Sequence, residues 1–155
     1  MEIQYRPLTR ADGAAFYQLI GQEKVAATMR FDCPRSRAES DHILEEYLCP
    51  DNRTFALCSP QGALWGVFAF KGAGDTADLS QMQAPAQWGR GLGAQVLRDM
   101  IALARREGWY RALEGYVLET NTASRRMAEK NGFREKDRRR FPGMTEDLLI
   151  YRLEL

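Results

Sequence analysis

A glycine-rich turn constrains this chain more than any other feature of its sequence. Three glycines alternate within residues 88–94, between an expected strand at residues 77–84 and an expected helix at residues 95–107. Glycines let the backbone approach a ligand closely, and the helix that follows offers unpaired N–H groups and the positive end of its dipole. The spacing therefore predicts a phosphate-binding cradle to which Arg90 adds a positive charge. A plain glycine-rich turn is the alternative.

Two other phosphate-binding motifs fit this turn less well. The dinucleotide-binding fingerprint has the spacing G-x-G-x-x-G after an N-terminal strand, with an acidic residue about 20 positions further on. Here the spacing is G-x-G-x-G, and the turn lies past the middle of the chain. A P-loop ends in Gly-Lys-Ser/Thr, whereas this turn ends in Gly93-Ala94-Gln95. A nucleotide-binding α/β domain is therefore an alternative that the spacing disfavours.

Strands and helices alternate along the chain. Runs of apolar residues bounded by turn residues predict strands, and apolar residues three or four positions apart predict helices. This order predicts an α/β (α+β) fold in which one mixed central sheet is flanked by helices. The expected strands cover residues 3–6, 54–58, 64–70, 77–84, 112–118 and 147–155; one expected helix starts near Thr9, and the others cover residues 36–48, 95–107 and 122–130.

The composition is that of an ordinary globular domain. The chain has 155 residues, enough for a single domain over residues 1–155 with its own core. Its 22 basic and 21 acidic residues leave a net charge of +1, so neither nucleic acid nor a membrane is the expected partner. No apolar run approaches the roughly 18 residues of a membrane span. The first residues also lack the apolar core of a signal peptide.

Cysteine and histidine are scarce. The three cysteines, Cys33, Cys49 and Cys58, are an odd number without metal-ligand spacing, which indicates reduced thiols in a cytoplasmic protein. His42 is the single histidine. We therefore expect no metal site and no histidine-based catalytic triad.

The second half of the chain resembles the GNAT superfamily of acyltransferases. The turn Pro85–Gly93 matches the family's P-x-x-x-G-x-G-x-G/A motif, and Asn121–Phe133 matches its N-x-x-A/S-x-x-[LM]-x-E-K-x-G-F helix motif. The two motifs stand in the family's order, separated by one helix and one strand, and the match covers roughly residues 77–155. Residues 77–82 are similar to the corresponding segment in the branch of the family that includes ribosomal-protein N-terminal acetyltransferases.

The resemblance implies a GNAT fold and acetyl-CoA (coenzyme A) as the acyl donor. In the family the turn binds the pyrophosphate, and the end of the preceding strand binds the pantetheine arm through its main chain. Asn121 is at a position that binds cofactor atoms, although it also fits an Asx-type helix cap, and the two roles are compatible. The implied cofactor-binding residues are Met82, Gln83, Ala84, Trp88, Gly89, Arg90, Gly91, Leu92, Gly93, Ala94, Asn121 and Ser124.

The resemblance also implies that an amine attacks the thioester directly. The amine must lose a proton before attack, and the departing thiolate benefits from a hydroxyl donor. Asp78 is at a position that is often acidic in the branch, which makes it the first candidate for base or amine anchor; a solvated strand residue is the alternative. Glu114 and Glu119 are weaker candidates. Many family members have a tyrosine acid at the position of Ala128, and Ser124 is the substitute that the matched helix offers.

The basic run Arg138-Arg139-Arg140 is open to two interpretations. It is either a solvated hairpin or a contact for an acidic acceptor near the mouth of the site. Trp88 is an unusual first residue for the turn, and its indole is expected to pack under the turn or against the following helix.

Two functions of different classes follow from these patterns. The first is an N-acetyltransferase that transfers the acetyl group of acetyl-CoA to a primary amine of a protein N-terminus or a small molecule. The second is a catalytically inactive acetyl-CoA-binding sensor or interaction module, which the absence of a tyrosine at Ala128 favours. Homodimers are common in the family, so a homodimer is one expected assembly.

Overall fold

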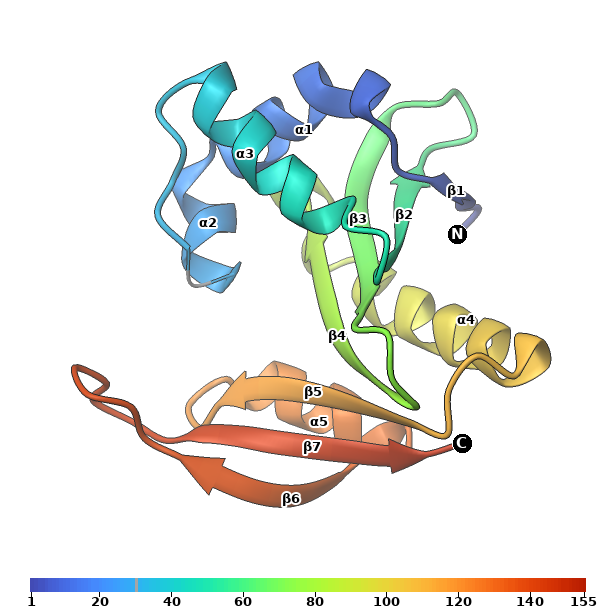
Figure 1. Ribbon diagram of the computed structural model, residues 1–155, viewed down its shortest axis with the longest axis vertical. Coiled ribbons are helices and arrows are strands. Elements are labelled where there is room, and N and C mark those ends of the chain that lie inside the picture. The colour runs from blue at the N-terminus through green and yellow to red at the C-terminus, as the bar shows by residue number, and fades with distance from the viewer. Residues whose placement is uncertain (30) are drawn as a thin grey trace. The chain divides into compact units, whose positions relative to one another are not determined.

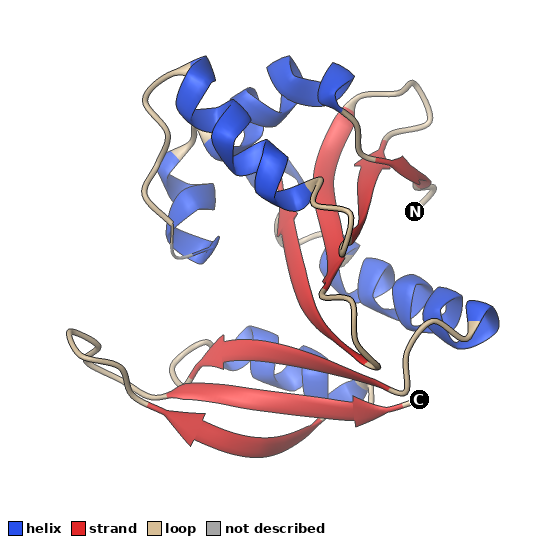
Figure 2. Ribbon diagram, viewed as in Figure 1, coloured by secondary structure: helices blue, strands red, loops and turns tan. Residues whose placement is uncertain are grey.

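The computed structural model describes residues 1–29 and 31–155. In the described part of the chain, seven strands follow the hydrogen-bonded order β1-β2-β3-β4-β5-β7-β6, and α-helices lie in the β1–β2, β4–β5 and β5–β6 connections (Figures 1 and 2). The β4–β5 pair is parallel, whereas the β1–β2, β2–β3, β5–β7 and β6–β7 pairs are antiparallel. The predicted mixed α/β sheet is therefore confirmed.

The chain divides into two compact units, and the boundary runs through β4. Unit 1 contains Met1–Lys71 and Ser80–Gly93, and unit 2 contains Gly72–Leu79 and Ala94–Leu155. The elements of unit 1 are β1 (Gln4–Pro7), a 3-10 turn at Arg10–Asp12, α1 (Gly13–Ile20), α2 (Glu23–Met29), α3 (Arg37–Tyr47), β2 (Arg53–Cys58), β3 (Leu64–Lys71), the second half of β4 (Thr76–Gln83) and a 3-10 turn at Pro85–Gln87.

In unit 1, helices α1, α2 and α3 share an apolar core with the strands. Phe16 and Ile20 of α1 are fully buried, together with Val67 of β3 and Met82 of β4. On β3 the core residues Val67 and Ala69 are two positions apart, because every second residue of a strand lies on the same face of a sheet. The core thus fixes the end of β4, from which the glycine turn departs.

Unit 2 contains the first half of β4 and most of α4 (Leu92–Glu107), followed by four elements that complete the chain. Figure 1 shows β7 lying between β5 and β6, as the pairing requires. Helix α5 follows β5 and lies against these strands. The four completing elements are β5 (Ala112–Leu118), α5 (Thr122–Lys130), β6 (Arg134–Arg139) and β7 (Leu148–Glu154).

Two elements were missed from the sequence. Helix α2 has seven residues and shows too little periodicity to be recognised beside α1. Strand β6 is exposed at all six positions, so it has no apolar alternation and is held as an edge strand by β7. In addition, α4 begins at Leu92, three residues earlier than expected, because Gly93, the last glycine of the turn, lies in its first turn. No helix among the described residues is long and apolar enough to cross a membrane.

Candidate functional site

The glycine turn of unit 1 has a backbone conformation that depends on glycine. Gly89 and Gly91 have φ values of 73° and 80°, in the left-handed region that side chains other than glycine disfavour. A Cβ atom added at either position would meet no heavy atom within 4 Å. These two glycines are therefore required by the backbone, and the space above them is open to a ligand.

The helix that follows supplies hydrogen-bond donors. Helix α4 starts at Leu92, directly after Gly91, and the first four N–H groups of an α-helix have no partner within the helix. These groups and the helix dipole favour an anion at this end. The turn and the helix start together present main-chain N–H donors of the kind that favour a bound anion.

Two glutamine side chains of β4 bring polar atoms to the same place. A Cβ atom on Gly93 would lie 3.4 Å from the Oε1 atom of Gln83 and 3.8 Å from the Nε2 atom of Gln81. The Oε1 atom of Gln81 and the Nε2 atom of Gln83 are buried and without a hydrogen-bond partner among the described residues. Buried polar atoms without a partner are uncommon in native proteins. From the sequence, Gln83 is expected to contribute its main chain only, and the side chains of Gln83 and Gln81 near Gly93 come from the structure.

The indole of Trp88 folds back over the end of β4. Its Nε1 donates to the Gln83 carbonyl at 2.9 Å, while the ring remains exposed. The Ala84 N–H donates to the Trp65 carbonyl of β3 at 2.7 Å. The expected pantetheine contacts at Gln83 and Ala84 thus meet main-chain groups that already have one partner, although a carbonyl oxygen can accept a second bond. The indole is thus hydrogen-bonded to the end of β4.

Arg90 is exposed at the tip of the turn. Its Nη1 donates to the neutral Oε1 of Gln87 at 3.2 Å, and no carboxylate pairs with it among the described residues. The guanidinium charge is therefore not neutralised locally. An anion that binds the turn would meet an available cation.

In unit 2, Asn121 caps the start of α5. Its Oδ1 accepts the Ser124 N–H at 3.2 Å, as the Asx-cap interpretation expects. This bond uses only the oxygen, so the amide NH₂ group is a donor that a ligand can use. Ser124 is half-buried in the first turn of the helix, and Ala128 is buried one turn further on.

Asp78 and Glu114 are cross-strand neighbours in the parallel β4–β5 ladder of unit 2. Glu114 has a side chain only 11% exposed and binds both Lys136 Nζ and Arg152 Nη1 at 2.9 Å. Burial raises the pKa of the Glu114 carboxyl, but the hydrogen bonds from Lys136 and Arg152 outweigh it, and the pKa is lowered. Glu114 is thus a structural carboxylate that is poorly placed to accept a proton.

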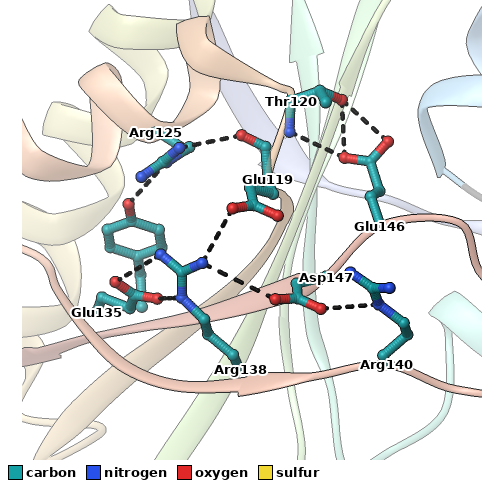
Figure 3. Close-up of polar contacts among 9 residues, drawn as sticks. Glu119, Thr120, Arg125, Glu135, Arg138, Arg140, Glu146 and Asp147 are labelled. Atoms are coloured by element: carbon teal, nitrogen blue, oxygen red, sulfur yellow. Dashed lines mark hydrogen bonds and ion pairs between the residues drawn. The ribbon is translucent and has the colours of Figure 1, made fainter.

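The basic run lies in a network of carboxylates (Figure 3). Arg138 pairs with Glu135 and also with Glu119 at 3.0 Å, and Arg140 pairs with Asp147 at 2.9 Å. Arg139 pairs with Asp137 at 3.4 Å. The solvated-hairpin interpretation therefore describes this run, and its charges are matched within unit 2.

Glu119 is tied to the same network. Its carboxylate binds Arg138, and its main-chain carbonyl accepts a bond from Arg125 Nη1 at 3.1 Å. Thr120 next to it donates from its main chain to Glu146 at 2.9 Å. These bonds hold the link between β5 and α5 in place, so Glu119 has a structural part in the start of the Asn121 helix.

A family model described as an acetyltransferase (GNAT) domain matches residues 2–134 of the chain. The chain belongs to the GNAT acetyltransferase family. It is accordingly an N-acetyltransferase that uses acetyl-CoA as the acyl donor. No curated protein matches the sequence. Within the described residues, no group of three or more His, Cys, Asp or Glu side chains could hold a metal ion.

Solved structures share the fold over nearly the whole chain. A spermidine N-acetyltransferase from Vibrio cholerae, in complex with CoA and spermine, is 16% identical with a TM-score of 0.85, over 98% of this chain and 95% of that one. A ribosomal L7/L12 α-N-protein acetyltransferase is 18% identical with a TM-score of 0.81, over 99% and 90%. A GCN5-related N-acetyltransferase from Kribbella flavida is 24% identical with a TM-score of 0.77, over 99% and 98%. The fold is therefore shared with enzymes that act on different amines.

Proposed function

We propose that this chain transfers the acetyl group of acetyl-CoA to a primary amine of a small molecule or a peptide, with the pyrophosphate bound at Trp88–Ala94. The observation that carries the proposal is the open space above Gly89 and Gly91, both at positive φ, in front of the first turn of α4. The side-chain amides of Gln81 and Gln83 near Gly93 support it, because they bring hydrogen-bonding groups for a polar ligand to the start of α4.

Acetyl-CoA supplies an activated acetyl group on a thioester. The residues proposed to hold it are those of the turn, with Arg90 as the cation for a phosphate, and Asn121 through its amide group. The strand end Met82–Ala84 is proposed to orient the pantetheine arm. Met82 contributes main-chain groups only, because its side chain is buried in the core of unit 1.

Asp78 is proposed to take the proton of the attacking amine. It is partly exposed on β4, whereas Glu114 beside it is engaged by two cations and Glu119 lies in the Arg138 network. Ser124 is the hydroxyl of the matched helix and is proposed to contact the acyl donor. Its N–H is already used in the Asn121 cap, which leaves the hydroxyl for this contact.

The experiment tests acetyl-CoA binding first and then a panel of acceptor amines. Calorimetry with acetyl-CoA measures binding, and release of free thiol is then measured with spermidine, spermine, an aminoglycoside, a lysine-containing peptide and a peptide with the N-terminus of L7/L12. Stimulated release with one of these amines and its loss in Asp78→Asn are expected. If acetyl-CoA binds and no amine in a broad panel stimulates release, the transferase proposal fails and the sensor alternative holds. A chain that binds no acetyl-CoA would overturn the site.

A homodimer is proposed as one assembly, and sedimentation of the purified protein tests it.

A further inference from the structure

Tyr116 of β5 is a tyrosine that sequence analysis did not single out. Unit 2 has three tyrosines, and two of them are buried: Tyr110 is 7% exposed and Tyr151 is 1% exposed. The hydroxyl of Tyr151 is further occupied by Arg125 and Glu129, at 3.2 and 3.0 Å. Tyr116 is 37% exposed, so it is the phenol of unit 2 that a ligand can reach.

The sheet register places Tyr116 beside the proposed base. Asp78 is opposite Glu114 in the parallel ladder, and Tyr116 is two residues further along β5. Residues two apart on a strand share a face, so the side chains of Asp78, Glu114 and Tyr116 lie on the same face of the sheet. The recorded ladder between these strands ends at Asp78 and Glu114. Tyr116 is the first side chain of β5 beyond this end on the Asp78 face.

The charges around the phenol keep it protonated. Burial is the largest cause of a raised pKa of Tyr116, and the negative charges of Asp78 and Glu114 raise it further. Arg139 and Lys136 of β6 oppose this effect in part. On β7 the residue opposite Tyr116 is the apolar Ile150, and the cation of that strand, Arg152, is paired with Glu114. A phenol in these surroundings holds its proton at neutral pH and can donate it.

We propose that Tyr116 is the proton donor of the transfer reaction, in place of the tyrosine that helix α5 lacks at Ala128. This proposal rests on the proposed function. When the amine nitrogen forms its bond to the acyl carbon and the carbon–sulfur bond breaks, Tyr116 Oη gives its proton to the departing sulfur. Asp78 takes the proton that the amine nitrogen loses. The protonated Asp78 carboxyl then returns this proton to the Tyr116 oxygen, which restores both residues and balances the reaction.

The main test is the variant Tyr116→Phe, which removes the hydroxyl and keeps the ring. Its kcat, with the amine on which the wild type is most active, is expected to fall about 100-fold, within the range for loss of a general acid. Acetyl-CoA affinity by calorimetry is expected to stay within about twofold, because the proposed cradle is untouched. The alkaline limb of the pH profile of kcat should also be lost. Tyr110→Phe, the matched removal of a phenol hydroxyl elsewhere in unit 2, should retain both kcat and the limb.

A second readout does not depend on activity. Tyrosinate absorbance of the free protein is titrated with base, and the difference between wild type and Tyr116→Phe gives the ionisation of Tyr116. This pKa is expected above the usual value for tyrosine, and Asp78→Asn should lower it. If Tyr116→Phe does not fold, site-specific replacement of Tyr116 by 3,5-difluorotyrosine keeps the test, since a more acidic phenol should move the alkaline limb to lower pH.

The outcomes separate this inference from the function on which it rests. Wild-type transfer with an unchanged kcat and alkaline limb in Tyr116→Phe would overturn the role of Tyr116 and leave the transferase proposal intact. An alkaline limb unmoved by difluorotyrosine would do the same. Absence of transfer by the wild type would instead remove the transferase proposal itself, and with it the role of Tyr116.

Discussion

The glycine turn of unit 1 and the arginine hairpin of unit 2 are the two places where this chain concentrates features of an anion-binding site. In the turn, Arg90 donates to the neutral Gln87 amide and has no carboxylate partner among the described residues, and the space above Gly91 is open. In the hairpin, Arg138 and Arg140 are paired with carboxylates. A dense basic run is thus a weaker indicator of an anion site than one cation beside an open backbone cradle, because local carboxylates neutralise the run.

Substitution of Gly91 should have the largest effect, and it tests the turn side of this comparison. Gly91→Trp forces a side chain into a left-handed conformation (φ 80°) and fills the cradle with an indole. Acetyl-CoA affinity, measured by calorimetry, is expected to fall at least about 100-fold, which corresponds to roughly 2.7 kcal/mol. Gly143→Trp is the matched control in the hairpin, with φ 87° and equally open space. Equal affinities of the two variants would remove the turn as the pyrophosphate site.

The second-largest effect is expected at the buried Glu114 carboxylate of unit 2, and it concerns stability rather than binding. Glu114→Gln loses the charge that Lys136 and Arg152 share, and we expect about 1–3 kcal/mol less stability at pH 7, the lower part allowing for the exposure of Lys136. The folded-state pKa of Glu114 is lowered, so its contribution is present above the unfolded pKa of about 4.3 and is lost as the pH falls through the folded value.

Urea denaturation at pH 7 and near pH 3 checks this prediction. The difference in free energy of unfolding between wild type and Glu114→Gln should be smaller at the lower pH. Glu154→Gln, which loses a solvent-exposed partner of Arg152, serves as the control and should change little. If this difference in free energy of unfolding is the same at both pH values, the carboxylate charge is not the cause of the lost stability.

Removal of the unpaired cation should have an intermediate effect on binding. Arg90→Ala is expected to weaken acetyl-CoA binding about tenfold, since a charge-assisted bond to phosphate contributes about 1–2 kcal/mol. The loss should be smaller at high salt, because the site is exposed and its charges are screened. Calorimetry at two salt concentrations measures both effects. The paired Arg139 gives the control, and Arg139→Ala binding as weakly as Arg90→Ala would contradict the contrast between the regions.

The hairpin network should give the smallest effect. Asp147→Ala removes the partner of Arg140 and one partner of Arg138, but Arg138 keeps Glu119 and Glu135. Exposed pairs contribute little to stability, so we expect a lower Tm than wild type but a smaller loss than in Glu114→Gln. Acetyl-CoA affinity should be unchanged. A marked loss of affinity in Asp147→Ala would show that the network also supports the cofactor site through the start of α5.

The sequence was most informative where structure depends on near neighbours. The positive φ values of Gly89 and Gly91, the long helix after them and the Asn121 cap each follow from residues within one or two turns of one another. Such local preferences can be predicted from the sequence without knowledge of the fold. Strand β6 was missed for the complementary reason, since every one of its residues is exposed and only pairing with β7 defines it.

What the sequence by itself determined is the family, the acyl donor and the turn proposed to bind it, because motif and backbone conformation are encoded locally. Tertiary structure alone decided which charges are available: Glu114 is held by Lys136 and Arg152, and Tyr116 is left exposed on the Asp78 face. These pairings join strands distant in sequence, and the side-chain alternation of a strand makes them depend on register. A charge or a hydroxyl has its chemistry set by such neighbours, which only the folded sheet brings together.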